Sequence, residues 1–240
     1  RPMQKIITRL GLPVLLVGIV SVGFTTRRTQ MVMRTPYTMH STQTSYNIGA
    51  PGSYLNATKV KYQKANGDWK EITTYFNRDG SVKAVNTCIA ITNVGVFEVN
   101  DNLRELIFIS PKAHAMHLET EDQLRADPKF VREDKVLGYK TIVEHESQIG
   151  KPDFVETHRA PALGGAIIKI VDSGATPDQY TVIEATRIDV GEPTESFNYP
   201  AYPFSYSFYQ SQIEKEELLG HKQAAASMRQ LVAKHQAAYK

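Results

Sequence analysis

The sequence predicts a mainly β protein, in which one N-terminal transmembrane helix precedes a mostly antiparallel sheet and a C-terminal helix follows it. Three observations predict this. An apolar run from Leu10 to Phe24 is flanked on both sides by Lys and Arg. After it come short alternating segments separated by Gly, Pro, Asn and Asp, as in antiparallel strands. From about Ser207 onward the chain is rich in Ala, Gln and Glu, which favour helix.

The apolar run is the predicted membrane anchor, residues 1–25. At about 1.5 Å per residue, Leu10 to Phe24 covers roughly 22 Å, against a hydrocarbon core of roughly 30 Å. Extending the helix back to Ile6 repairs most of the deficit, because the long side chain of Arg9 can reach the headgroups. A cleaved signal peptide is the alternative, but no small-residue cleavage site follows the run.

Charge alone does not orient this anchor, because Lys and Arg are evenly balanced on its two sides. A first hydrophobic segment usually sends the following chain across the membrane, so we expect a single-pass protein of the inner membrane with its bulk in the periplasm. The lipid bilayer is then one partner. A net charge of +3 over 240 residues, with scattered basic residues, argues against a nucleic-acid partner.

Two regions follow the anchor. Residues 26–56 are rich in Thr, Ser, Met and Tyr without sustained periodicity, and they predict an extended linker. The β domain is expected over residues 57–203. A hairpin opens it, joining Thr58–Gln63 to Trp69–Phe76 through an Asn-Gly-Asp turn, and an Asn-Arg-Asp-Gly turn leads onward.

The rest of the domain predicts further strands and one short helix, Glu119–Ala126, which Pro128 stops. The strands are expected at Val82–Ile91, Val94–Val99, Leu103–Ile109, Val136–Glu146, Phe154–Arg159, Ala166–Asp172 and Tyr180–Val190. Eight or nine strands result, and we expect them to share a single core. Its expected members are Trp69, Tyr75, Ile89, Ile107, Val143, Ile168 and Ile183.

Residues 204–240 predict a helical extension, with helix from about Ser207 to Tyr239 and Gly220 placed to divide it. A single amphipathic helix needs a surface to bury against. That surface is either the domain's own sheet or another subunit, and the sequence does not decide between them.

Few residues suggest chemistry. The chain has no P-loop, dinucleotide, serine-hydrolase, zinc-protease or haem-attachment motif. The single cysteine, Cys88, lies in an apolar stretch and is expected to be a buried, inert thiol. His114 and His117 stand beside acidic residues, but two histidines alone do not define a metal site. We therefore expect no enzyme activity, no metal and no cofactor.

Two strand patterns place acidic side chains near histidine. Glu144 and His145 are successive strand residues, so they face opposite sides of the sheet and do not form a catalytic pair. Glu156 and His158 share a strand face and predict a solvated cross-strand charge pair. The two glycines that begin at Gly164 predict a tight turn.

Three stretches together resemble a known group: VLGYKT from Val136, ETHRAPALGGAIIKI from Glu156, and TRIDVGEPTESFNYPAYP from Thr186. They are similar to a pattern in uncharacterised extracytoplasmic proteins of acidobacteria and related phyla, over roughly residues 59–203. The resemblance implies a curved antiparallel half-barrel like that of the periplasmic lipoprotein carriers and sensors (LolA-like), which hold acyl chains or partner surfaces. His158 stands where the pattern has an aromatic residue.

We therefore expect a non-catalytic accessory subunit that docks on and stabilises a larger membrane protein complex, respiratory or photosynthetic, with other membrane protein subunits as partners. The alternative is a tethered lipid- or lipoprotein-binding protein that uses the concave face of the half-barrel. Aromatic and Met side chains are enriched at interface centres. The expected partner-binding residues are Met31, Met33, Tyr37, Tyr46, Tyr54, Tyr202, Phe204, Tyr206, Phe208 and Tyr209.

Overall fold

The computed structural model describes residues 34–47, 52–111, 119–147, 154–173 and 179–239. The expected membrane anchor, the first part of the linker with Met31 and Met33, and His114 and His117 lie outside these residues. Within the described part, no helix combines the length and the apolar character that crossing a membrane requires.

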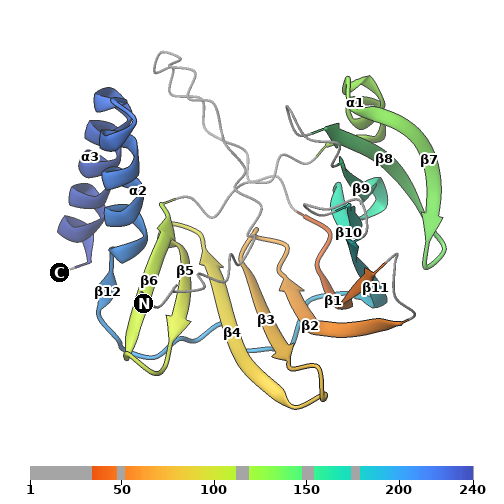
Figure 1. Cartoon of the computed structure of the whole chain (residues 1–240), viewed down its shortest axis with the longest axis horizontal. Helices are drawn as coiled ribbons and strands as arrows, with labels where there is room; N and C mark the ends of the chain where they lie inside the picture. Colours follow the sequence, from red (N-terminus) through yellow and green to blue (C-terminus); the bar gives the residue numbers. More distant parts are fainter. Residues whose placement is uncertain (1–33, 48–51, 112–118, 148–153, 174–178, 240) are drawn as a thin grey trace, which may run out of the picture. The chain divides into compact units, whose positions relative to one another are not determined.

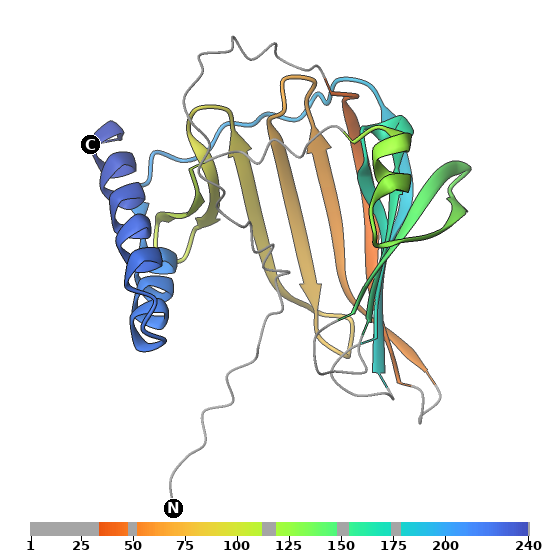
Figure 2. The same cartoon turned by 90° about the horizontal axis from the view of Figure 1, so that it is seen from above.

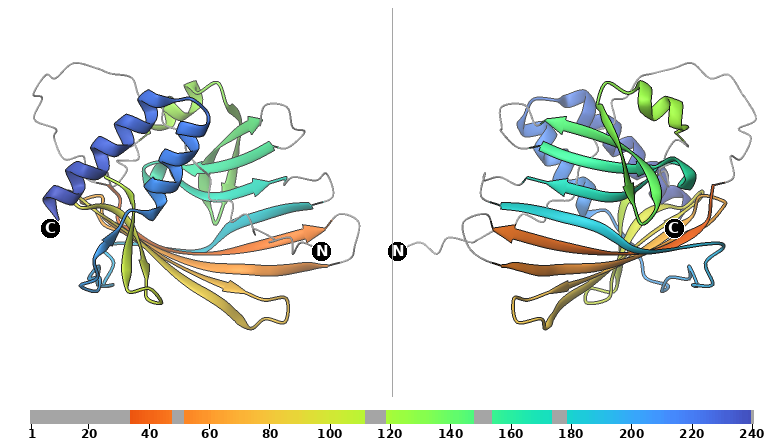
Figure 3. Two further views of the ribbon diagram at one scale, coloured as in Figure 1. Left: turned by 60° about the vertical axis from the view of Figure 1, so that its left-hand side comes forward. Right: turned by 90° about the vertical axis from the view of Figure 1, so that its right-hand side faces the viewer.

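The described residues form one large curved sheet that does not close on itself, followed by two helices (Figure 1, Figure 3). Its strands lie in the order β12-β6-β5-β4-β3-β2-β1-β11-β10-β9-β8-β7. All neighbours are antiparallel except β12 and β6, which are parallel. A mainly β, mostly antiparallel fold with C-terminal helix is therefore confirmed.

The elements have the following bounds. The strands are β1 (Tyr37–Asn47), β2 (Ser53–Gln63), β3 (Trp69–Phe76), β4 (Val82–Ile91), β5 (Gly95–Asn100), β6 (Glu105–Ser110), β7 (Phe130–Val136), β8 (Tyr139–Ser147), β9 (Phe154–Ala160), β10 (Ala166–Asp172), β11 (Gln179–Val190) and β12 (Phe204–Ser205). The helices are α1 (Glu121–Ala126), the 3-10 turn η1 (Pro161–Leu163), α2 (Ser207–Leu218) and α3 (Lys222–Ala238).

Strands with clear turn signals lie where the sequence places them. The opening hairpin is β2 and β3, and the second turn leads into β4. The short helix α1 is capped by Thr120, whose side chain accepts a hydrogen bond from the backbone of Gln123. Gly220, with φ +79°, separates α2 from α3 as expected. Gly164 and Gly165 form the tight turn after η1, both with positive φ.

The expected linker, residues 26–56, is wrong over its second half. Residues 37–47 form β1, which is hydrogen-bonded to β2 on one edge and to β11 on the other, near the middle of the sheet. The strand is rich in Thr, Ser and Tyr rather than in alternating aliphatic residues, so periodicity does not reveal it. The β domain therefore begins at about Tyr37 and ends with β12, at Phe204–Ser205, rather than spanning residues 57–203.

A second missed strand, β7, lies at the edge of the sheet. Its sequence FVREDKV is mostly charged, which is typical of an edge strand that resists pairing with another chain. It forms a hairpin with β8 through Leu137 and Gly138, both with positive φ. The strand predicted at Val136–Glu146 therefore starts too early: Val136 is the last residue of β7, and β8 begins at Tyr139 after the turn.

The sheet has one face that the C-terminal part of the chain covers. Lys70, Ile89, Phe97 and Phe108 are successive register partners across β3, β4, β5 and β6, so their side chains point to the same face. Residues 191–203 cross the strands there, as Figure 2 shows, and α2 and α3 follow against β6. We call this side of β3–β6 the covered face.

The expected single core is instead three clusters of buried side chains. One joins Tyr37 and Met39 of β1 to Ile168 of β10, the second centres on Phe97, and the third on Phe108. Of the expected core residues, three are buried and four are half-buried. The buried ones are Ile89, Val143 and Ile168; the half-buried ones are Trp69, Tyr75, Ile107 and Ile183.

Ile168→Ala tests the first cluster. Ile168 is 2% exposed, so we expect the free energy of unfolding in urea to fall by about 2–5 kcal/mol, through lost burial and the cavity left behind. Val85→Ala is the matched control, because Val85 is 57% exposed and its loss is expected to change stability by about 0.5 kcal/mol or less. Equal effects of the two substitutions would contradict the placement of Ile168.

Candidate functional site

Three of the expected partner-binding residues are covered by the chain itself. Tyr37 is 3% exposed and packs in the first cluster. Tyr206 and Tyr209 are each 9% exposed and pack around the ring of Phe108. These three rings therefore do not lie open to water, because the sheet and the C-terminal helices already bury them.

The C-terminal helices pack on the domain's own sheet. Phe108 of β6 contacts Tyr206 and Tyr209, while Met228 and Leu231 of α3 pack against the same cluster. Of the two surfaces that the sequence leaves open, the structure thus uses the domain's own. Two more expected residues, Tyr202 and Phe204, are half-buried beside Phe97, and Phe208 is 38% exposed on α2.

The remaining two expected residues, Tyr46 and Tyr54, lie at one end of the sheet. The ring of Tyr46 stacks on Tyr180 of β11, with centroids 4.6 Å apart and planes 6° from parallel. Tyr54 is register partner of Ser45, beside Tyr46, and the guanidinium of Arg78 lies 5.4 Å from its ring centroid. Because Tyr54 pairs with Ser45 and successive strand residues alternate, the Tyr54 ring lies on the opposite face of this sheet end from the rings of Tyr46 and Tyr180.

Exposed aliphatic side chains lie near the same end of the sheet. Leu55 follows Tyr54, and Val82 and Val85 begin β4, reached through the turn that carries Arg78. Their exposed fractions are 41%, 59% and 57%, and that of Tyr54 is 36%. We call Tyr46, Tyr54, Leu55, Val82, Val85 and Tyr180 the strand-end patch. Sequence reasoning missed its aliphatic members because single exposed Val and Leu residues carry no signal of their own.

The face opposite the covered face is polar at its middle. Lys61, Glu71, Cys88 and Glu98 are successive register partners across β2, β3, β4 and β5 and share this face. Lys59 lies beside them, with its ammonium 3.9 Å from the carboxylate of Glu71. We call this row the polar row. These charged side chains offer an acyl chain no favourable contact, whereas charged and polar groups on a protein surface can form ion pairs and hydrogen bonds with them.

Burial decides the protonation of two groups in the polar row. Burial, and then the nearby carboxylates of Glu71 and Glu98, raise the pKa of the Cys88 thiol to about 12. Burial also raises the pKa of Glu98 above its usual value. A thiol with this pKa stays protonated at neutral pH. Cys88 is half-buried, whereas the sequence predicts a buried thiol.

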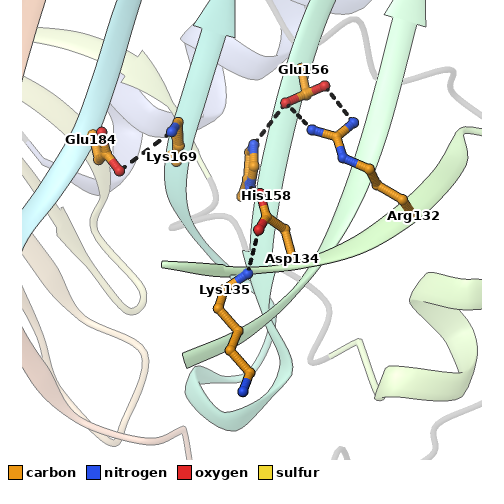
Figure 4. Close-up of polar contacts among 7 residues, drawn as sticks. All are labelled: Arg132, Asp134, Lys135, Glu156, His158, Lys169 and Glu184. Carbon is orange, nitrogen blue, oxygen red and sulfur yellow. Dashed lines mark hydrogen bonds and ion pairs between the residues drawn. The ribbon is translucent and has the colours of Figure 1, made fainter. Parts of the chain in front are cut away.

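A chain of polar contacts joins the edge strand β7 to β9, across β8 (Figure 4). Both guanidinium NH2 groups of Arg132 donate to the carboxylate of Glu156 at 2.8 Å. Glu156 also lies 2.9 Å from Nε2 of His158, and Nδ1 of His158 lies 3.6 Å from Asp134 of β7. The guanidinium holds the pKa of the Glu156 carboxyl below its usual value.

This arrangement confirms that Glu156 and His158 share a strand face, but the pair is not solvated. His158 is 1% exposed, and its Nδ1 has no hydrogen-bond partner among the described residues. The two ring nitrogens face different carboxylates, so Glu156 and Asp134 do not converge on one point as metal ligands do. In the described part of the chain no group of three or more His, Cys, Asp or Glu is arranged to hold a metal ion.

Glu144 illustrates the same strand alternation. It is 8% exposed and accepts a hydrogen bond from Nε of Arg159 at 2.7 Å, while His145 follows on the other face and is exposed. The two residues therefore do not form a catalytic pair, as predicted. Lys169 and Glu184, whose charged atoms lie 3.4 Å apart, extend the polar side chains onto β10 and β11 (Figure 4).

Comparison with known proteins yields remote structural similarities. No family model matches the chain, and no curated protein does. An uncharacterised conserved protein of Thermus thermophilus aligns with 72% of this chain and 91% of its own, at 13% identity and a TM-score of 0.44. In the MucA/MucB complex of Pseudomonas aeruginosa, the matched chain aligns over 71% of this chain and 58% of its own, at 13% identity and a TM-score of 0.41.

A domain of an outer membrane lipoprotein-sorting protein from Vibrio parahaemolyticus also matches. It aligns with 68% of this chain and 89% of its own, at 10% identity and a TM-score of 0.27. The function proposed below rests on residues of this chain and not on these similarities.

The bidentate contact between Arg132 and Glu156 should stabilise the edge strand measurably. In a double-mutant cycle with Arg132→Ala and Glu156→Ala, we expect a coupling energy of about 0.5–1 kcal/mol at low salt that falls as salt screens it. Because the pKa of Glu156 is lowered in the folded state, this contribution is present above the carboxyl's usual pKa and is lost as the pH falls below it.

The ion pair of Arg187 and Asp189 is the matched control for this cycle, since its side chains are 69% and 47% exposed. We expect a coupling energy near zero for it. Coupling of the same size in both pairs, or none between Arg132 and Glu156, would contradict the proposed link between β7 and β9.

Proposed function

We propose that this protein is a non-catalytic, membrane-anchored accessory subunit that docks on a larger membrane protein complex through its strand-end patch. The observation that carries the proposal is the exposure of four large apolar side chains at one end of the sheet, beside the stacked rings of Tyr46 and Tyr180. Exposed apolar side chains gathered in one place are typical of a protein contact, whereas scattered ones are not.

The composition of the patch fits a protein partner. Tyr54 presents a ring with Arg78 above it, and Tyr and Arg are the residue types that most often dominate binding energy at interfaces. Leu55, which strand alternation turns to the opposite face from Tyr54, and Val85 add exposed apolar area near the same end of the sheet. The patch thus combines an aromatic centre with a charged neighbour at its rim.

The strand-end patch lies at the end of β1 opposite to Tyr37. The described chain enters the domain at Arg34, whose backbone N–H donates to the carbonyl of Ala65 at the turn between β2 and β3. Tyr46 lies near the other end of β1, about 31 Å from Tyr37 for an extended strand.

A lipid- or lipoprotein-binding role receives less support from these residues. It requires an open apolar face, but on β3–β6 one face is covered by the C-terminal segment and on β2–β5 the other carries the polar row. A groove of about 420 Å³ lies between α2 and α3, and Gln, Glu and Arg side chains line much of it.

Co-purification in mild detergent tests the proposal. The full chain should bring down the same set of membrane subunits each time, and Tyr54→Ala with Leu55→Ala should weaken that association at least about tenfold, because interface centres carry most of the binding energy. The thermal midpoint should stay unchanged, since both side chains are exposed.

The control is Leu218→Ala with Leu219→Ala at the end of α2, where the two side chains are 89% and 58% exposed. These variants should co-purify normally. Undiminished association of the Tyr54 and Leu55 variant, or loss only in the control, would refute docking through the strand-end patch. Binding of the purified chain to protein-free vesicles, lost in the same patch variant, would instead point to lipid.

A further inference from the structure

His235 is the one histidine of α3, and aromatic rings surround it. It is 6% exposed. Its ring centroid lies 3.8 Å from that of Phe108 on β6, 4.9 Å from that of Phe204 on β12 and 4.5 Å from that of Tyr239. The imidazole is therefore the polar centre of the contact between the helices and the covered face.

Both ring nitrogens of His235 have a partner when the ring is neutral. Nε2 lies 3.0 Å from the carbonyl oxygen of Val94, in the turn between β4 and β5, and Nδ1 lies 2.7 Å from the hydroxyl of Tyr206. A carbonyl only accepts hydrogen bonds, so Nε2 carries the hydrogen. Nδ1 then accepts from Tyr206, and the neutral ring is fully satisfied.

A second proton on this ring would find no counter-charge. The groups that face the ring are phenols, phenyl rings and a backbone carbonyl: Tyr206 before α2, Tyr239 after α3, Phe108, Phe204 and Val94. None of the carboxylates in the described residues is among them. Burial accordingly lowers the pKa of His235, although the Val94 carbonyl acts in the opposite direction.

The helices depend on this contact because little else fastens them to the sheet by hydrogen bonds. Tyr239 donates from its hydroxyl to the carbonyl of Asn93 at 2.6 Å, next to the bond from His235 to Val94. Neither α2 nor α3 has a side-chain cap at its N-terminus. Behind the contact, Phe108 is 0% exposed and packs against Tyr209, Met228 and Leu231, so release of the helices would uncover it.

We propose that α2 and α3 form a releasable cover over the β5–β6 part of the covered face, and that protonation of His235 releases it. The pKa of His235 is lowered in the covered state and has its ordinary value near 6.5 in the released state. At a pH between these two values, the released state therefore binds more protons than the covered state. Docking of the helices is therefore fully favoured above that ordinary value and is lost as the pH falls toward the lowered one. This inference is independent of the strand-end patch.

Hydrogen–deuterium exchange of the full chain at pH 7.5 and at pH 5.0, corrected for intrinsic rates, tests the proposal. Amides of α2 and α3 should exchange about tenfold faster or more at pH 5.0, because release of the helices from the sheet opens their backbone hydrogen bonds to water. Amides of β1, β2 and β11 should stay protected. No acceleration, or equal acceleration over the whole sheet, would overturn the proposal.

Two variants test whether His235 causes the pH dependence of hydrogen exchange in α2 and α3. His235→Gln has no titrating ring, so its helices should exchange at the same rate at both pH values, whether that rate is slow or fast. His221→Gln is the control, because His221 lies in the turn between the helices, 2.8 Å from Glu216, and is 59% exposed. It should keep the wild-type pH dependence. Persistence of that dependence in His235→Gln would overturn the proposal.

A titration that needs no variant complements these measurements. The ring protons of His235, followed by nuclear magnetic resonance in the wild-type chain, should titrate together with the increase in exchange of α2 and α3, at a pH below about 6.5. Titration at or above that value, with the exchange of the helices unchanged, would overturn the proposal.

Discussion

One apolar row across the three strands β4, β5 and β6 determines how the C-terminal segment packs. Ile89, Phe97 and Phe108 point to the same face of an open sheet, and such a face is unstable in water until something covers it. The chain covers it with its own C-terminal segment: Tyr199 packs on Phe97, and Tyr206 with His235 packs on Phe108. Lys70, the polar register partner of Ile89 on β3, pairs with Glu195 at 2.6 Å.

This cover changes the interpretation of the aromatic residues near the C-terminus. A high density of Tyr and Phe suggests a partner surface, but Tyr206 and Tyr209 already pack inside the domain. Among the described residues, the exposed aromatic residues are Tyr54 at the end of β2, and Phe208 and Tyr239 in the C-terminal segment. Only Tyr54 has the exposed aliphatic residues Leu55 and Val82 at the same end of the sheet. A partner contact is therefore better placed at Tyr54 and its neighbours than on the helices.

The sequence predicts this fold well where turns are explicit. Asn-Gly-Asp and Asn-Arg-Asp-Gly turns locate β2, β3 and β4, because these residues adopt the required backbone conformations at little cost. It misses β1 and β7, since neither alternates apolar and polar residues. β1 is specified by backbone pairing on both edges and by Tyr37 and Met39 at one end, and β7 by its hairpin with β8.

The candidate sites depend on contacts between residues distant in sequence, which local pattern cannot supply. Glu156 and His158 are visible as a pair in the sequence, but their partner Arg132 is 24 residues away from Glu156 and lies in a missed strand. Likewise, the polar row requires the registers of four strands. Tyr46 and Tyr54 were found by residue type, whereas Leu55, Val82 and Val85 become part of the patch only through the pairing of β1 to β4.

The central claim is that the C-terminal segment covers this row of the sheet, with α2 and α3 packed over Phe108. Nuclear Overhauser effects in the isotope-labelled full chain at pH 7.5 test it most directly. The account predicts strong effects from the ring protons of His235 to those of Phe108 and Tyr206, whose rings lie 3.8 and 5.7 Å away. Their absence, together with unprotected amides in α2 and α3, would contradict the account.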